Sequence, residues 1–454
     1  MDSYELTFYG LSTICFILFT VLNPNKKTKP SEAAKLLTSE EDSNDDTIMK
    51  KLHRRYLTVY SFAALGDWLQ GPYLYALYES YGLVRYDIHL LFYCGFTSSM
   101  IFGPFCGYFS DKYGRKLNCI AYCIIYAASC ITKQYNDFTI LMLGRVLGGI
   151  ATSILWSAFE SWIISQHKID GKSVHPDKIG NYINTVFGNQ VFINGLVAII
   201  AGILAQKVSD VYGYVAPFNV GAMVLCFCMG IILLLWTENY GEETQTSKES
   251  NQFAKVWEVL KKEKEMNMIG LTQAFFESSM YCFVSEWTPA LNTIEGVSLP
   301  FGTIFSAFMV AMMIGTYFFK VWIATQKGKG NLERLMVRCL MMSFVVFAMT
   351  PFISTPFQRF AMFLMFEMCV GVFWPTISSL RSSYIPEDVR SMVMNIFRIP
   401  LNFLVVAILA PEFSVDTIFS ICSGLLLVTV YVMNNLAQKK KNSDVTADRL
   451  EEAL

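Results

Sequence analysis

The sequence contains long apolar runs that follow one another from one end of the chain to the other. A run of about 20 apolar residues is long enough for a helix to cross the ~30 Å hydrocarbon core of a bilayer. We count thirteen such runs. Because only helices and closed barrels satisfy their own backbone hydrogen bonds in lipid, the runs predict an all-α, polytopic membrane protein. The first run covers about Leu6 to Leu22, and the others begin near Tyr56, Ile88, Leu117, Phe138, Tyr182, Tyr214, Met268, Leu299, Leu335, Phe357, Met392 and Val415.

The composition agrees with a chain that is surrounded mostly by lipid. Of the 454 residues, 53% are hydrophobic and only 16% are charged, whereas an ordinary soluble domain has about 25% charged residues. The formal net charge of -1 argues against a strongly basic surface for nucleic acid. The 12 cysteines lie mostly inside apolar runs and form no CxxC pair. We interpret them as small apolar side chains and predict neither a metal site nor a cofactor.

A longer polar stretch, Thr237 to Glu265, divides the last twelve runs into six plus six. Most other connections are short, so successive helices are expected to run antiparallel. The predicted domains are an extra N-terminal transmembrane helix (1–24), a flexible cytoplasmic linker (25–55), a six-helix bundle (56–236), a cytoplasmic inter-bundle linker (237–265), a second six-helix bundle (266–437) and a disordered cytoplasmic tail (438–454). The first linker is polar and acidic, which is typical of segments that cannot bury enough surface to order themselves.

Lysine and arginine are concentrated in alternate loops, which predicts the orientation of the chain. Basic residues close to a helix end resist translocation and mark the cytoplasmic side. Lys112, Lys261, Arg381 and Lys439 all fall in the basic set of loops. We therefore place the C-terminus in the cytoplasm and expect an integral, multi-pass monomer in the plasma membrane.

The segment from Gly107 to Lys116 reads GYFSDKYGRK and matches the pattern GxxxDKxGRK at every fixed position. It strongly resembles the signature loop of the major facilitator superfamily, where such a loop latches two six-helix bundles in one state. Gly114 permits a tight turn between two helices, and Arg115 is placed to pair with an acid. We expect that acid to be Glu160. The predicted latch is Gly107, Asp111, Gly114, Arg115, Lys116 and Glu160.

A finer resemblance is carried by five shorter segments. These are Asp67–Tyr75, Ser157–Trp162, Gln273–Ser278, Glu286–Pro289 and Asn395–Pro400, and Gly144 to Gly149 adds a membrane arginine where the superfamily often has one. Together with the extra first helix, they resemble the molybdate-anion transporter family. The resemblance implies two six-helix bundles that import the oxyanion molybdate by alternating access.

Charges near the middle of a membrane helix cost roughly 2.5 to 3.5 kcal/mol, so each one suggests a function. The superfamily's two halves are parallel repeats with substrate held between them. Overlaying the halves matches Gln190 with Arg398, and Arg145 with Glu367. An oxyanion presents only acceptor oxygens, so Arg398 and Arg145 are the predicted clamps. Neutral donors are predicted from Asn395, Gln190, Asn402 and Gln70, with Asn189 and Gln273 as further amides.

Other interpretations of these residues remain open. Arg145 can form a fixed ion pair with Asp67, and Arg398 can do so with Glu367 or Glu277. The amides can form hydrogen bonds between helices, worth about 0.6 kcal/mol each, in place of substrate contacts.

Energetics favours coupling to a cation. Moving a dianion into a cell that is negative inside costs about 2 × 2.3 kcal/mol per 100 mV. Protonation of a membrane carboxylate would offset this cost. Asp67, Glu277 and Glu367 are the candidates, and we favour Glu277 or Glu367 because three acids face two arginines.

Alternatives to molybdate transport are a carrier of another organic anion or a sugar, and a transport-inactive scaffold or sensor. An organic ring would stack on aromatic side chains such as Trp68 and Trp374. We do not expect an enzyme, since no HExxH, GxSxG or Walker loop occurs. The 4 histidines fall near expected helix ends or in loops, which predicts surface positions.

Overall fold

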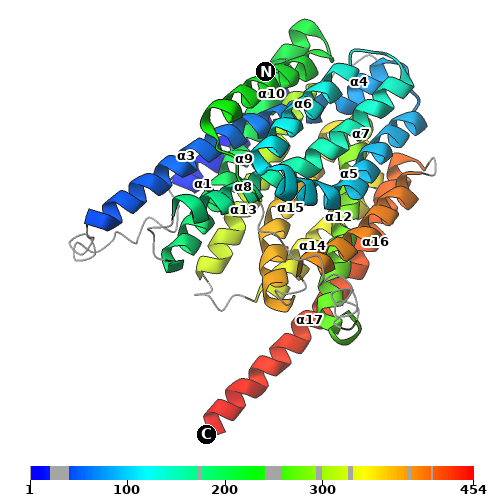
Figure 1. Cartoon of the computed structure of the whole chain (residues 1–454). Helices are drawn as coiled ribbons and strands as arrows, with labels where there is room; N and C mark the ends of the chain where they lie inside the picture. Colours follow the sequence, from blue (N-terminus) through cyan, green and yellow to red (C-terminus); the bar gives the residue numbers. More distant parts are fainter. Residues whose placement is uncertain are drawn as a thin grey trace. The chain divides into compact units, whose positions relative to one another are not determined.

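The computed structural model describes residues 2–20, 40–171, 176–240, 258, 260–292, 299–325, 331–385, 390–410 and 413–453. Within these ranges every regular element is a helix (Figure 1). The α-helices are α1 (Ser3–Thr20), α3 (Glu40–Trp68), α4 (Leu74–Ser80), α5 (Arg85–Tyr113), α6 (Arg115–Thr132), α7 (Phe138–Leu155), α8 (Ala158–Asp170), α9 (Pro176–Tyr212), α10 (Ala216–Leu235), α12 (Lys264–Leu291), α13 (Phe301–Thr325), α14 (Leu332–Met349), α15 (Pro356–Tyr384), α16 (Arg390–Leu409) and α17 (Val415–Ala453).

The chain divides into two compact units. The amino-terminal unit comprises Asn25–Thr244 and Pro300–Ser306. The carboxyl-terminal unit comprises Met1–Pro24, Gln245–Leu299 and Ala307–Leu454. The polar stretch after α10 thus coincides with a passage from one unit to the other, as its composition suggests.

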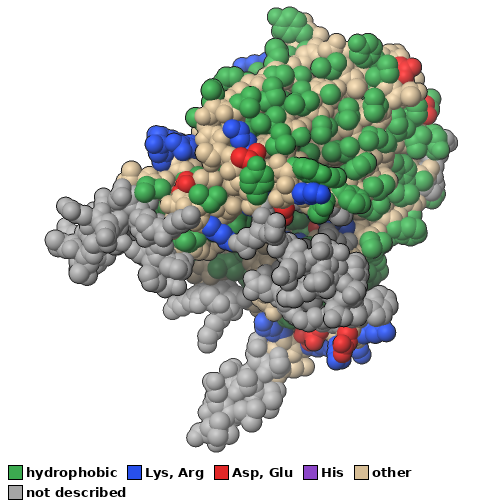
Figure 2. Space-filling view, in the orientation of Figure 1, with side chains coloured by type: hydrophobic (Ala, Val, Ile, Leu, Met, Phe, Trp, Pro, Cys, Tyr) green, Lys and Arg blue, Asp and Glu red, His purple; other side chains and the backbone are tan. Residues whose placement is uncertain are grey.

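Seven helices in the described part of the chain are long and apolar enough to cross a membrane. Large apolar side chains remain exposed on them, including Leu234 at 86% and Phe352 at 79%. Figure 2 shows hydrophobic side chains spread over much of the surface in view. An apolar exterior of this kind fits a hydrocarbon surrounding. The seven spans are Phe138–Asp170, Ile179–Tyr212, Ala216–Leu235, Phe301–Thr325, Leu332–Phe352, Pro356–Tyr384 and Val415–Asn442.

In the amino-terminal unit, small residues bring α5 and α7 close together. A Cβ atom on Gly149 would clash with the carbonyl oxygen of Gly95. The Ser98 hydroxyl donates to the carbonyl of Val146 at 2.8 Å, and the Ser99 and Ser153 hydroxyls are 2.9 Å apart. Close backbone approach through small residues is how membrane helices associate without a hydrophobic driving force between them.

The carboxyl-terminal unit uses glycine in the same way where α13 crosses α15. A Cβ on Gly371 would clash with the carbonyl of Met312, and a Cβ on Gly315 would clash with the carbonyl of Met368. The Thr316 hydroxyl donates to the carbonyl of Gly371 at 3.1 Å. The two glycines therefore fix a reciprocal close contact between these helices.

The first helix, α1, packs against the carboxyl-terminal unit through one face. The Tyr4 ring lies 5.7 Å from Phe357 and 5.1 Å from Phe360, both on α15. Tyr4 is buried, whereas Leu6 and Phe16 on other faces of the helix are 64% and 69% exposed. A helix with one buried face and several exposed apolar faces suits the edge of a membrane bundle.

Two predicted irregular segments differ from the structure. The linker expected over 25–55 is helical from Glu40, because α3 starts there; residues 21–39 lie outside the described ranges. Tyr182 on α9 donates to Asp46, which ties this extension to the unit. The tail expected to be disordered from 438 continues α17 to Ala453, in a sequence rich in the strong helix formers lysine, glutamate, alanine and leucine.

We predict that Gly371→Ala destabilises the carboxyl-terminal unit. The added methyl has no room at the crossing, and overpacking of this kind costs roughly 1–3 kcal/mol. Gly424→Ala is the matched control, because no atom lies within 4 Å of its added Cβ. Thermal unfolding of the purified protein in detergent measures both variants. Equal melting temperatures for Gly371→Ala and the parent would contradict the tight crossing.

Candidate functional site

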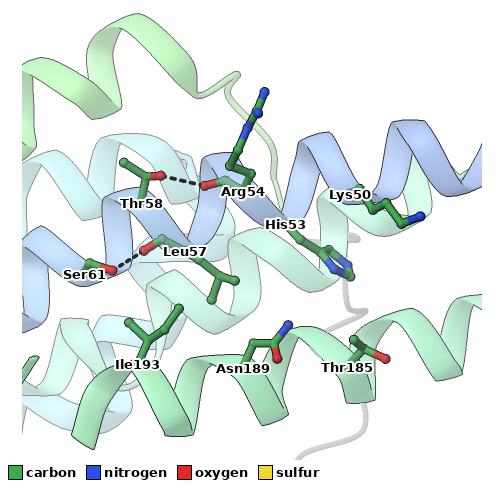
Figure 3. A pocket seen from close by; sticks show the side chains of 9 residues that line it. All are labelled: Lys50, His53, Arg54, Leu57, Thr58, Ser61, Thr185, Asn189 and Ile193. Atoms are coloured by element: carbon green, nitrogen blue, oxygen red, sulfur yellow. Dashed lines mark hydrogen bonds between the residues drawn. The ribbon is translucent and has the colours of Figure 1, made fainter. Parts of the chain in front are cut away.

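A cavity of about 500 Å³ lies between α3 and α9 in the amino-terminal unit (Figure 3). It extends along α3 from Lys50 to Ser61, about 16 Å at 1.5 Å per residue. His53 and Asn189 point into the gap between the two helices, and Arg54 extends away from α9 at the rim. The lining residues are Lys50, His53, Arg54, Leu57, Thr58, Ser61, Thr185, Asn189 and Ile193.

The lining combines two cations with neutral polar groups and two aliphatic side chains, and none of its described residues is a carboxylate. Lys50 shares part of its charge with Asp46, at 3.5 Å on the preceding turn, and both side chains are largely exposed. Arg54 has no acidic partner within the part of the chain described. A recess that offers cations, hydroxyls and an amide is suited to a ligand that carries only acceptors.

Gln190, a predicted substrate donor, is instead occupied by protein partners. It is buried, and its carbonyl accepts a 2.8 Å hydrogen bond from the Tyr56 hydroxyl. Its amide nitrogen donates to Glu160 at 3.4 Å. The neighbouring Asn189 is the amide that reaches the cavity. For Gln190, the structure therefore favours hydrogen bonding between helices.

The polar residues near the end of α3 also have internal partners. Asp67 accepts a 2.5 Å hydrogen bond from Tyr126, and the Trp68 indole donates to Asn194 at 3.0 Å. Gln70 is buried and donates to the carbonyl of Gly66 at 3.2 Å. The alternative ion pair between Asp67 and Arg145 is not formed.

Arg145 is held against α5. Its Nε donates to the carbonyl of Leu91 at 3.0 Å, and its guanidinium lies 5.0 Å from the centre of the Phe92 ring. The nearby Lys133, just after α6, is buried and donates to the Ser129 carbonyl at 2.9 Å. Burial, with a smaller contribution from the charge of Arg145, lowers the pKa of Lys133 to about 7. Arg145 does not line the cavity between α3 and α9.

A second polar cluster lies in the carboxyl-terminal unit. Gln273 and Glu277 are buried one turn apart on α12, with a 2.7 Å hydrogen bond from the Gln273 amide to the Glu277 carboxylate. Arg381 on α15 donates to Gln273 at 3.4 Å. Arg381 and Arg398 both lie within Coulombic range of Glu277. Two guanidinium groups therefore lie near the Glu277 carboxylate.

The sequence pattern missed Arg381 as a site residue and assigned it to a basic loop. The signal was the length of the helix, because α15 continues for 29 residues to Tyr384 and carries Arg381 along its last turn. Arg398 on α16 is exposed, and its carbonyl accepts from Asn402 at 2.8 Å. Asn395 lies on the same helix, but its side chain is outside the described part.

Glu367, on α15, is buried. Within the described part of the chain, its carboxyl group forms no hydrogen bond or ion pair. Neither Glu277 nor Glu367 is in an ion pair with Arg398 there. Of the three predicted proton carriers, Glu367 is thus the one without a hydrogen-bonding partner.

The signature loop is anchored differently from the prediction. Gly107 lies in α5, and Gly114 turns the chain into α6 with a φ of 115°, a conformation that favours glycine. Arg115 pairs with Asp111 at 2.7 Å, one turn earlier. The expected pair between Arg115 and Glu160 is wrong, because Asp111 is already within reach and Glu160 accepts from Gln190.

Glu238, which the sequence pattern did not single out, holds the start of α6. Its carboxylate accepts from the backbone N–H groups of Lys116 at 2.8 Å and Leu117 at 3.0 Å. The Lys116 ammonium in turn donates to the Trp236 carbonyl at 2.7 Å. An acid at a helix N-terminus satisfies free N–H groups and matches the helix dipole.

Histidine positions also differ from expectation. His53, His89 and His167 are buried, and His175 is outside the described ranges. The Nε2 atoms of His53 and His167 are 2.9 Å apart. Burial lowers the pKa of His53, which precedes the apolar run near Tyr56, to about 4, and His167 adds to this effect. His53 therefore stays neutral at physiological pH and adds no charge to the cavity.

Comparisons with known proteins extend these observations. A family model described as sugar transporters with 12 transmembrane helices matches residues 4–373. The chain is 32% identical over 399 residues to the molybdate-anion transporter of Takifugu rubripes, covering 82% of each chain. It is 31% identical over 382 residues to that of Danio rerio, covering 78% of each. A solved structure of the nucleoside transporter NupG, carrying one substitution, superposes with a TM-score of 0.66 at 13% identity, covering 86% of this chain and 99% of NupG.

The helical architecture and the apolar spans define an integral multi-pass membrane protein with the fold of solute transporters. Its matched family and the relatives named above are transporters. The chain belongs to the major facilitator superfamily and, within it, to the molybdate-anion transporter family.

We predict that the cavity between α3 and α9 is wet and attracts anions. In a Cys226→Ser background, Thr58→Cys should react with a small anionic thiol reagent at least about tenfold faster than with a cationic one of equal size. Val59→Cys, at a fully buried position beside it, should stay unmodified. Intact-protein mass spectrometry follows both reactions. Equal rates with the two reagents would contradict the positive character of the cavity.

Proposed function

We propose that this chain imports molybdate by alternating access between two six-helix bundles, with α1 as an additional transmembrane helix. The observation that carries the proposal is the lining of the cavity between α3 and α9. Its described residues offer two cations, hydroxyls and the Asn189 amide, and no carboxylate is among them. Molybdate is the substrate in the names of the relatives that cover most of this chain.

The same lining argues against a carrier of sugars or organic ring compounds. Such ligands are typically held on aromatic side chains with a few polar groups. Among the described residues that line the cavity there is no phenylalanine, tyrosine or tryptophan. Trp68, a candidate for stacking an organic ring, is not part of this lining.

Within the carboxyl-terminal unit we propose Arg398 as the principal oxyanion ligand, with Arg381 beside it. Both guanidinium groups lie within Coulombic range of Glu277, and such groups suit the acceptor oxygens of an anion. Arg145 remains a proposed second clamp, and Asn395, Asn402 and Gln70 remain proposed neutral donors. Glu367 is the proposed proton carrier, supported by its burial without a hydrogen-bonding partner among the described residues.

We predict that Arg398→Ala abolishes molybdate uptake by the purified protein in liposomes. Arg398→Lys keeps the charge but replaces the planar guanidinium, and one charge-assisted hydrogen bond of about 1.5–3 kcal/mol is lost. The half-saturating concentration of molybdate should therefore rise roughly 10- to 100-fold. Arg334→Ala, at an exposed position on α14, is the control and should transport normally. Sulfate as competitor reports selectivity. Normal apparent affinity in Arg398→Ala would place the oxyanion site elsewhere.

We predict that Asp111→Ala lowers the rate of transport while the protein stays inserted and folded. Asp111 is half exposed, and i,i+4 pairs at a surface contribute only about 0.3–0.5 kcal/mol. Lys262→Ala removes an i,i+4 pair of the same spacing with Glu258 at 2.6 Å and should leave transport unchanged. Initial uptake rates and melting temperatures separate the two effects. An unchanged uptake rate in Asp111→Ala would remove the latch role.

A further inference from the structure

The carboxyl-terminal unit contains an apolar groove between α13, α14 and α15. Its volume is about 270 Å³. Each of these three helices belongs to the set that is long and apolar enough to span a membrane. The groove is lined by Phe318, Leu335, Arg338, Cys339, Met342, Met365, Met368, Cys369 and Val372.

The groove opens on an exposed apolar surface. Its edges include Phe318, Met342 and Met365, which are 48%, 43% and 39% exposed. Its floor includes the buried thiols Cys339 and Cys369, and the Cys339 thiol donates to the Cys369 carbonyl at 3.2 Å. Since the surrounding medium of such a surface is lipid, a flexible hydrocarbon chain is the ligand that fits the recess.

One end of the groove is cationic. Arg338 is exposed, and its guanidinium lies 4.9 Å from the centre of the Trp322 ring. Within the described residues, no carboxylate pairs with Arg338. Glu333, the nearest acid in sequence, bonds Tyr384 at 2.7 Å and Lys440 at 3.5 Å. The Trp322 indole N–H is buried without an acceptor there, and the Arg338 guanidinium beside it is free of an acidic partner among the described residues.

Arg338 lies in the half of α14 that follows a basic segment of the sequence. It lies six residues after the first residue of the helix, about 9 Å along the axis. The sequence before α14 contains Lys327 and Lys329. Basic residues near the end of a membrane helix attract anionic headgroups, each contributing about 1 kcal/mol.

We propose that this groove is a binding site for one anionic glycerophospholipid. An acyl chain lies between α13, α14 and α15, and the phosphate is held by Arg338, whose guanidinium lies over the Trp322 ring. The unpaired charge of Arg338 selects a headgroup with a net negative charge over a net-neutral one, since only the former has a net Coulombic attraction to the guanidinium. This site is separate from the residues proposed for transport, and it does not rest on the identity of the transported anion.

The test uses the full-length chain, purified and delipidated in detergent. Native mass spectrometry and melting temperature are measured with phosphatidylserine, and with phosphatidylcholine of identical acyl chains. We expect phosphatidylserine to bind at least tenfold more tightly and to raise the melting temperature more. Glycerophosphoserine, the headgroup without chains, should neither bind nor compete, which separates a lipid site from a simple anion site.

Substitutions in and beside the groove test where the lipid binds. Arg338→Gln should remove the preference for phosphatidylserine, whereas the control Arg334→Gln should retain it. Val372→Phe fills the groove and should weaken both lipids. In the unmodified protein, phosphatidylserine with a photoreactive acyl chain should label the peptides that contain Met342 or Met365. Equal affinity for the two lipids, a preserved preference in Arg338→Gln, or labelling confined to other helices would overturn the proposal.

Discussion

The absence of water from hydrocarbon determines most of what this chain has to do. Each backbone polar group in lipid must be satisfied within the protein, and this requirement makes every regular element a helix in the ranges described. Buried polar side chains also need hydrogen-bonding partners, and individual contacts supply them. Asp67 bonds Tyr126, and Gln190 bonds both Tyr56 and Glu160. A polar group that is left open to a cavity, such as Asn189, is then conspicuous.

The fold class could be predicted because the length of the apolar runs directly indicates helices that are surrounded by lipid. Individual contacts were less predictable, because they depend on residues far apart in the chain. Glu238 caps α6 from more than 120 residues away, and nothing in its local sequence indicates that role. Arg381 looked like a loop residue because an apolar run does not report how far its helix continues. Near the ends, tertiary anchoring and helix propensity extended α3 and α17 beyond their apolar parts.

The candidate site shows that adjacent residues with the same chemistry can have different roles. Gln190 and Asn189 are adjacent amides on α9, yet one is committed to neighbouring helices and the other lines the cavity. Consecutive residues on a helix point about 100° apart, so a small error in the assumed face exchanges their roles. The histidines were misjudged for a related reason: an expected helix end marked their position along the chain, whereas burial depends on which helix lies opposite.

The crossing of α13 and α15 has a mechanical consequence. Gly315 and Gly371 each receive a carbonyl of the opposite helix, so the two backbones touch without side chains between them. Side chains can change rotamer and let helices slide, but backbone against backbone has no such adjustment. The two helices therefore behave as a single stiff part. Any rearrangement within the carboxyl-terminal unit has to come from contacts that side chains mediate.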